Sequence, residues 1–233
     1  PDATIFWHWS VVKLNATLVT TWLNMMLLTG GAALITARLS AGAKLSRWQN
    51  LLEVLVEGIE SELEAIGLDP PRAFLPFLGT LFIFILFSNL LAIVPGYRPP
   101  TGSLSTAAAL AGCVFIAIPY WGIKRQGLTG YLKLYIQPSL IMLPFNIIGE
   151  LSRTLALAVR LFGNIMSGSM IGAILLIVAP LLFPVVMNLL GLIIGVIQAY
   201  IFAVLAAVYI AAAVRVEKSR EEKSPQEKGA LHG

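Results

Sequence analysis

The sequence is poor in the residues that build most catalytic and metal sites. It contains one cysteine and two histidines, and only 12% of its 233 residues are charged. The single cysteine, Cys113, excludes an internal disulfide and a cysteine-based metal cluster, and His8 and His232 lie near opposite ends of the sequence. No stretch matches the GxxxxGKS or GxxxxGKT loop that binds nucleotide phosphates. We therefore expect no metal site, no cofactor and no nucleotide chemistry in this chain.

Apolar residues are abundant instead. Hydrophobic residues make up 58% of the chain, and the mean hydropathy is +0.84. A soluble domain is usually about half apolar and a quarter charged, so this composition predicts an all-α polytopic membrane protein that contacts the lipid bilayer. The net charge of +4 does not predict a nucleic-acid partner, because the basic residues flank the apolar runs.

Five apolar runs are long enough to cross a bilayer as helices, which takes about 20 residues each. The first run stops at Arg38, the second is followed by PGYRPP and the third by GIKRQG. The five runs cover roughly residues 16–37, 74–94, 104–121, 138–178 and 181–214.

The last two runs are too long to cross the bilayer perpendicularly. At 1.5 Å per residue, about 40 helical residues span roughly 60 Å, which is twice the hydrocarbon thickness. We expect a long, tilted C-terminal helical hairpin. Its turn lies at APLLFP, where Pro180 and Pro184 interrupt the helix.

An amphipathic stretch at residues 46–66 separates the first two runs. Four glutamates share one face of the predicted helix, and five aliphatic residues share another. We expect an interfacial helix on the membrane surface with a solvated acidic face, rather than an acidic binding site. The two sets are Glu53, Glu57, Glu60 and Glu64, and Leu52, Leu55, Ile59, Leu63 and Ile66.

The basic residues predict the orientation in the membrane. Three Lys or Arg follow the first run, three follow the third and five follow the fifth, whereas the opposite side carries Lys13 and Arg98. The positive-inside rule then places residues 1–15 outside the cytoplasm and the polar, disordered tail 215–233 inside it. The beginning, PDATIFWHWS, has no basic region, so we expect no cleavable signal peptide there.

An arginine lies deep within the fourth run. A charge at membrane depth costs several kcal/mol, which makes Arg160 a functional candidate. Among the acidic residues, Glu150 is the one that lies within a long apolar run. It is about 15 Å from Arg160 along a helix, so we do not expect a direct ion pair between the two side chains. An ion pair or snorkelling to a headgroup are the structural alternatives. We favour a polar partner in another protein or a water-filled cavity facing Arg160.

Small and polar residues surround this position. Asn164 lies four residues after Arg160 and shares its face, and Gln198 is a strongly polar side chain in the last run. A strip of small residues lets another helix or water approach closely, although helix packing is the simpler interpretation of any single glycine. The small residues are Gly163, Ser167, Gly168 and Gly172 in the fourth run, and Gly191 and Gly195 in the last.

These residues carry a family resemblance. LSRTLALAVRLFGN, followed by a long apolar hairpin and IQAYIFAVLAAVYI, resembles subunit a of F-type ATP synthases, the membrane stator subunit that faces the rotating c-subunit ring. The RLFGN motif is specific in this context. FSNLLAIVPGYRPPTGSLSTAAALA, residues 87–111, is similar to a second conserved region more loosely. The resemblance covers residues 74–214, and the first 70 residues match in layout.

The resemblance implies that residues 74–214 translocate ions through two offset half-channels. Arg160 matches the family's essential arginine, which faces the ion-binding carboxylate of each c subunit. Asn164 and Gln198 match polar positions around the half-channels, and Glu150 fits an acidic position near the cytoplasmic exit. The implied partners are the c-ring, the b subunits of the peripheral stalk and the catalytic ATPase head. The implied location is a bacterial inner membrane, where this chain is a non-catalytic subunit.

The sequence departs from the family pattern at two positions. Many members carry a carboxylate or histidine nine residues after the arginine, where this chain has Ser169, and a compensating titratable group on the last helix near Gly191. The outer half-channel therefore lacks a titratable relay at both positions. Ser169, Asn164, Gln198 and water are expected to line it, which leaves the coupling ion open between H⁺ and Na⁺.

Two other functions compete with this interpretation. A secondary transporter would use Arg160 to bind an anionic substrate, but the sequence has no internal repeat and no glycine-broken half-helices. A purely structural assembly protein gives no reason for an arginine at membrane depth. The ion-translocating stator subunit is therefore the leading hypothesis.

Overall fold

The computed structural model describes residues 5–9, 12–36, 47–94, 97, 99–136, 141–178 and 183–215. Almost all of these residues are helical, which confirms the all-α class. Within these ranges, five helices are long and apolar enough to cross a membrane. They are α1 (Ala16–Thr36), α3 (Leu75–Leu90), α4 (Leu104–Ile136), α5 (Met142–Val178) and α6 (Phe183–Arg215).

A short antiparallel β-hairpin precedes α1 and has no counterpart in the expectation from sequence. It pairs β1 (Ile5–Trp9) with β2 (Val12–Asn15), and Trp9 lies opposite Val12. Aromatic and β-branched residues favour strands, which explains the hairpin locally. The other residues of the N-terminal segment, 1–4 and 10–11, lie outside the described residues.

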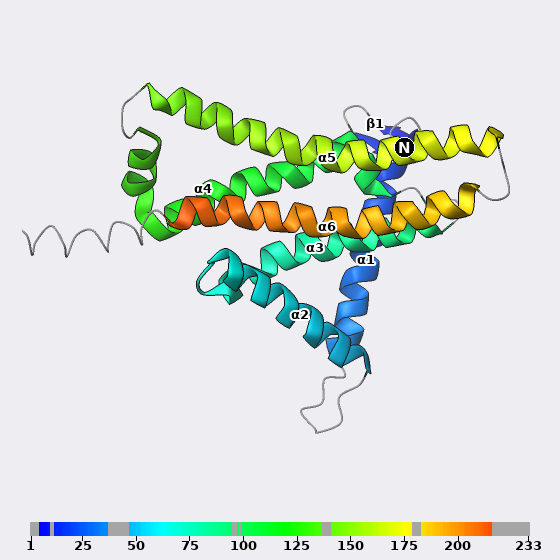
Figure 1. Cartoon of the computed structure of the whole chain (residues 1–233), viewed down its shortest axis with the longest axis horizontal. Coiled ribbons are helices and arrows are strands. Elements are labelled where there is room, and N and C mark those ends of the chain that lie inside the picture. The colour runs from blue at the N-terminus through cyan, green and yellow to red at the C-terminus, as the bar shows by residue number, and fades with distance from the viewer. Residues whose placement is uncertain are drawn as a thin grey trace, which may run out of the picture.

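Helices α5 and α6 form the long C-terminal hairpin that the sequence predicts. They contain 37 and 33 residues, so they are roughly 55 and 50 Å long, well above a hydrocarbon core of about 30 Å. Figure 1 shows them side by side along the molecule, with α1 standing steeply across them. If the 18-residue span Thr17–Leu34 of α1 crosses upright, α5 and α6 lie strongly tilted. The turn at residues 179–182 and the tail 216–233 lie outside the described residues.

Helices α3, α4 and α5 pack against α6 around one apolar core. Small side chains on α6 let the helix backbones approach closely, which is how helices associate in a membrane. This packing fixes the positions of α5 and α6, whose other faces stay exposed. The buried alanines of α6 are Ala199, Ala206, Ala207, Ala211 and Ala213.

Helix α2 (Arg47–Ile66) is the amphipathic helix expected at residues 46–66. Leu63 is buried and Ile59 packs against the core, as the apolar periodicity predicts. Three of the four glutamates are exposed. The fourth, Glu60, pairs with Arg72 at 2.9 Å, and Figure 1 shows α2 running obliquely beside α3.

Helix α4 does not end at Trp121, where the sequence analysis placed the end of the third run. It continues to Gly127, where φ of 73° and ψ of 165° break the helical geometry. Arg125 lies in the additional turns and donates a hydrogen bond to the backbone carbonyl of Asp69 at 2.7 Å. The predicted end was wrong because the basic residues find partners on the protein and do not terminate the helix.

Candidate functional site

Arg160 lies on an exposed face of α5. Its neighbours Leu157 and Leu161 point into the core, whereas Leu155 and Val159 are 56% and 59% exposed. In the part of the chain that the structure describes, no carboxylate forms an ion pair with Arg160. The arginine therefore stands on an apolar outer surface, where its charge is available to a partner.

Seven residues singled out from the sequence line one cavity of about 520 Å³, between α5, α6 and the connection from α3 to α4. Asn89, Tyr97 and Asn188 add polar groups to the lining. None of the lining residues is Asp, Glu, His, Lys or Arg. The polar surface of the cavity therefore consists of amides, hydroxyls and backbone groups. The seven residues are Asn164, Ser167, Gly168, Ser169, Gly172, Gly191 and Gly195.

A hydrogen-bond pair holds the inner wall of this cavity. The side-chain amide of Asn89 donates to the backbone carbonyl of Gly195 at 2.8 Å. The Thr101 hydroxyl donates to the other side-chain atom of Asn89, its Oδ1, at 2.9 Å. Asn89 is 6% exposed and Thr101 is fully buried, so both bonds are shielded from water. They fix α3 and the turn at Pro100–Gly102, just before α4, against α6.

A second pair connects the cavity to α1. The Tyr97 hydroxyl donates to Asn24 Oδ1 at 2.8 Å, and Asn24 Nδ2 donates to Ser88 Oγ at 3.0 Å. Burial raises the pKa of the Tyr97 phenol above its ordinary value, and the hydrogen bond to Asn24 opposes that rise. Tyr97 therefore keeps its proton over the physiological pH range.

Gln198 lies outside the cavity lining, one turn along α6 from Gly195. Its side chain is 5% exposed, and its Nε2 has no hydrogen-bond partner within the described residues. Leaving a buried amide unpaired costs about 1–3 kcal/mol. The N–H groups of Gln198 are thus available to an acceptor outside the described part of the chain.

The remaining polar positions are on α5. The hydroxyl of Ser169 donates back to the carbonyl of Met166 at 2.8 Å. Glu150 is half-buried, and its backbone carbonyl accepts a hydrogen bond from the Thr154 hydroxyl at 3.0 Å. Because α5 is continuous, Glu150 and Ser169 lie on opposite sides of Arg160, roughly 15 and 13 Å away along the axis.

The glycines named as packing positions differ in their surroundings. A Cβ built on Gly195 would lie 2.9 Å from Asn89 Cβ, so α3 and α6 approach closely there. No comparable contact lies within 4 Å at the other four positions. For those four, a role in helix packing stays a prediction. They are Gly163, Gly168, Gly172 and Gly191.

Sequence reasoning did not identify four polar residues of this site. Asn24, Asn89, Tyr97 and Asn188 come from α1, α3, the α3–α4 connection and α6. Their signal was an uncharged polar side chain within or beside an apolar run. That signal is weak, because a single amide or hydroxyl is common in membrane helices and its partner cannot be read from the local sequence.

Comparisons with known proteins identify the family. The family model described as ATP synthase A chain matches residues 18–211. ATP synthase subunit a of Albidiferax ferrireducens is 60% identical over 222 residues, which is 95% of this chain and 96% of the relative. ATP synthase subunit a of Nitrosospira multiformis is 57% identical over 213 residues, which is 91% of this chain and 85% of the relative.

A third relative shows the same similarity. ATP synthase subunit a 2 of Acaryochloris marina is 61% identical over 218 residues, which is 94% of this chain and 93% of the relative. Together with the five apolar helices, these matches make the chain an integral membrane protein. They also confirm the resemblance drawn from the RLFGN motif: the chain belongs to the ATP synthase A chain family.

Proposed function

We propose that this chain is the ion-translocating membrane subunit in the stator of a rotary F-type ATP synthase. Its family and its relatives named ATP synthase subunit a support this role. The observation that carries the mechanism is the exposure of Arg160 on α5. It lies one helical turn from Asn164, which lines a cavity without charged side chains.

Arg160 supplies a fixed positive charge to the rotating ring of c subunits. A guanidinium cannot be deprotonated in a protein, so it attracts an emptied carboxylate without competing for the proton. Its charge also repels a cation that would pass directly between the two half-channels. The exposed Leu155 and Val159 add apolar surface to the same helix.

The cavity beside Asn164 is the proposed outer half-channel, and Glu150 is assigned to the inner one. Their positions on opposite sides of Arg160 support two offset pathways. An ion then has to travel around the ring to pass from one to the other. A membrane potential acts on it with about 2.3 kcal/mol per charge per 100 mV, which biases the rotation.

Gln198 is proposed to assist at the ring-facing site. Its buried, unpaired amide can donate a hydrogen bond to a water molecule that accompanies the ion. Ser169 and Asn188 provide hydroxyl and amide groups for the outer pathway. Residues 74–214 thus form the ion-translocating domain of the proposal.

The assembly follows from the same role. The c-ring contacts α5 and α6, the b subunits of the peripheral stalk anchor this chain, and the catalytic head carries out the nucleotide chemistry. The distribution of basic residues places the tail 215–233 in the cytoplasm and residues 1–15 outside a bacterial inner membrane. This chain contributes no catalytic residue for ATP hydrolysis.

The coupling ion is H⁺ or Na⁺. The cavity lining contains no carboxylate or histidine that would relay a proton, and its amide and hydroxyl oxygens suit either hydrated ion. The Na⁺ dependence of ATP hydrolysis at fixed pH, measured on the whole complex, decides between the two ions.

The test uses the complete complex reconstituted in vesicles. Arg160→Ala should abolish ATP-driven ion pumping, and Arg160→Lys should impair it severely because an ammonium is a point charge that can lose its proton. Arg72→Gln is the matched control, because that arginine is exposed and pairs with Glu60 outside the proposed pathway. Normal coupled pumping by the Arg160→Ala complex would disprove the mechanism.

A further inference from the structure

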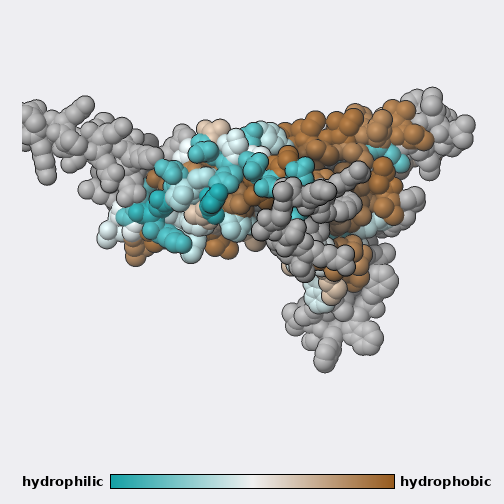
Figure 2. Space-filling view, turned by 90° about the horizontal axis from the view of Figure 1, so that it is seen from below, coloured by the Kyte–Doolittle hydropathy of each residue, from teal (hydrophilic) through white to brown (hydrophobic). Residues whose placement is uncertain are grey.

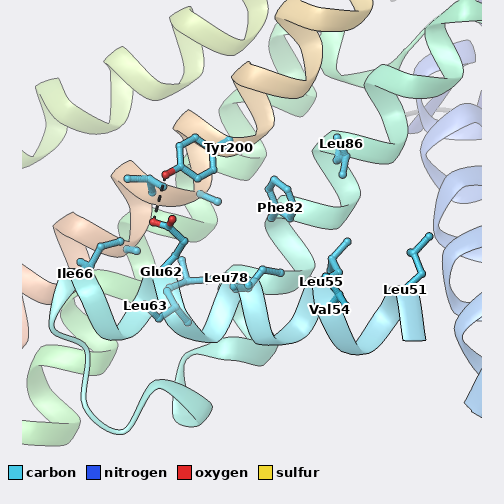
Figure 3. A pocket seen from close by; sticks show the side chains of 15 residues that line it. Leu51, Val54, Leu55, Glu62, Leu63, Ile66, Leu78, Phe82, Leu86 and Tyr200 are labelled. Atoms are coloured by element: carbon cyan, nitrogen blue, oxygen red, sulfur yellow. Dashed lines mark hydrogen bonds between the residues drawn. The ribbon is translucent and has the colours of Figure 1, made fainter. Parts of the chain in front are cut away.

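A second cavity, of about 490 Å³, lies between α2, α3 and α6. Its lining is aliphatic or aromatic with two polar exceptions, Glu62 on α2 and Tyr200 on α6. Figure 3 shows Leu55 and Phe82 within the apolar part, and Glu62 and Tyr200 close to one end of α2. None of the residues assigned to the ion pathway lines this cavity.

The polar end of the cavity carries a negative charge. The Tyr200 hydroxyl donates a hydrogen bond to Glu62 Oε2 at 3.2 Å (Figure 3). Glu62 is exposed, and a carboxylate accepts several hydrogen bonds, so one phenol does not saturate it. Within the described residues, the ion pair formed by α2 joins Arg72 to Glu60 and leaves Glu62 without a cation.

The length of the cavity suits one acyl chain. Its residues Leu51 and Glu62 lie about 16 Å apart along α2. Half of the roughly 30 Å hydrocarbon core is about 15 Å, the length over which one acyl chain extends. The two lengths match, and the lining between Leu51 and Glu62 is apolar.

The two ends of the cavity differ in the way that a lipid requires. Glu62 and Tyr200 lie near one end, whereas Leu51, Leu55 and Leu86 lie towards the other (Figure 3). Over the whole molecule, Figure 2 shows hydrophilic residues gathered towards one end of the long axis and hydrophobic ones towards the other. A headgroup at Glu62 and an acyl chain running towards Leu51 match this gradient.

We propose that the cavity binds one molecule of phosphatidylethanolamine, with its ammonium on Glu62 and an acyl chain against Leu55 and Phe82. A primary ammonium offers three hydrogen-bond donors to the carboxylate. A choline headgroup of the same charge offers none, and an anionic headgroup is repelled by Glu62. The bound lipid fills the space between α2 and the helices α3 and α6. This site goes beyond the proposed ion conduction and does not depend on it.

The test is photochemical labelling of the whole complex. It is reconstituted in vesicles of phosphatidylcholine and phosphatidylglycerol that contain a trace of phosphatidylethanolamine with a diazirine in its acyl chain. A phosphatidylcholine probe with the same diazirine serves as the comparison, and labelled residues are mapped by mass spectrometry. Glu62→Gln removes the charge, with Glu57→Gln as the matched control on α2. Ala203→Phe fills the cavity, with the exposed Ala212→Phe as its control on α6.

We expect the ethanolamine probe to label the cavity-lining residues in preference to the choline probe. Glu62→Gln should reduce that preference about tenfold, the equivalent of one charge-assisted hydrogen bond, and Ala203→Phe should remove the labelling. Both control variants should label like the wild type. The proposal fails if labelling is independent of the headgroup. It also fails if these residues crosslink to a segment of another subunit, since a protein would then fill the cavity.

Discussion

Asn89 and Gly195 bring α3 and α6 into direct contact. The Asn89 amide donates to the Gly195 carbonyl at 2.8 Å, and a Cβ on residue 195 would lie 2.9 Å from Asn89 Cβ. Glycine is required here because any side chain would push the two helices apart. Both residues line the cavity proposed as the outer half-channel, so this contact sets the position of its inner wall.

Gly195→Ala is expected to destabilise the packing of α6 by about 1–3 kcal/mol, the usual cost of overpacking. The measurement is the temperature at which this chain dissociates from the purified complex. Gly191→Ala, one turn away, is the matched control, because an added methyl group has no neighbour within 4 Å. Equal decreases of the dissociation temperature in the two variants would contradict a specific role for the contact between Asn89 and Gly195.

Tyr97→Phe should destabilise the connection between α3 and α4. The change leaves the fully buried Asn24 Oδ1 without its donor, at a cost of about 1–3 kcal/mol. Tyr120→Phe is the control, since the Tyr120 hydroxyl forms no hydrogen bond within the described residues and its side chain is 56% exposed. The temperature at which the chain dissociates from the purified complex is measured for both variants. An unchanged temperature for Tyr97→Phe would argue against the hydrogen bond between Tyr97 and Asn24.

We also expect Tyr97 to make the stability of the folded chain depend on pH in the alkaline range. Burial raises the pKa of Tyr97 in the folded chain, whereas the unfolded chain ionises near the ordinary value of about 10. The folded state then binds more protons in this window, so its extra stability is present below about pH 10 and is lost as pH rises above that value. Tyr97→Phe should lose less stability over the same range, and parallel pH profiles would refute the assignment.

Ser169→Asp should place a titratable group in a cavity lining that otherwise contains no carboxylate. The pH profile of ATP-driven pumping should gain a new step near the ordinary aspartate pKa of about 3.9, because the added carboxyl group titrates there. Ser169→Asn has nearly the same size without the charge and should show no such step. If the Asp and Asn profiles coincide, Ser169 does not face the conducting path.

Gly127→Ala should weaken the break in α4. Gly127 has φ of 73° and ψ of 165°, a conformation essentially restricted to glycine that costs an alanine roughly 1–3 kcal/mol. Gly112→Ala lies in a regular part of the same helix with open space around the added methyl group, and should stabilise it by about 0.5–1 kcal/mol. The measurement is the temperature at which the chain dissociates from the complex. A lower temperature for Gly127→Ala and a higher one for Gly112→Ala would support this assignment, whereas equal decreases would contradict it.

Particular residues show which features could be predicted from the sequence and which could not. The spacing of Ile59 and Leu63 predicted the packed face of α2, because a helix places residues three and four apart on one side. Arg160 could be singled out because a charge in an apolar run is costly wherever the helices pack. Asn89 could not be assigned in the same way, since its partner Gly195 is 106 residues away and lies in an equally apolar run.

The sequence by itself determined the membrane class, the helices, the amphipathic face of α2 and the exceptional position of Arg160. These follow from the bilayer as a solvent, which acts on each residue according to its own polarity and period. The tertiary structure decided which polar groups meet: it grouped Asn164, Ser169 and Asn188 around one cavity and placed Glu62 beside Tyr200 at another. Contacts between these polar groups depend on how closely the helices approach each other. That distance is set by packing between segments that are far apart in the sequence.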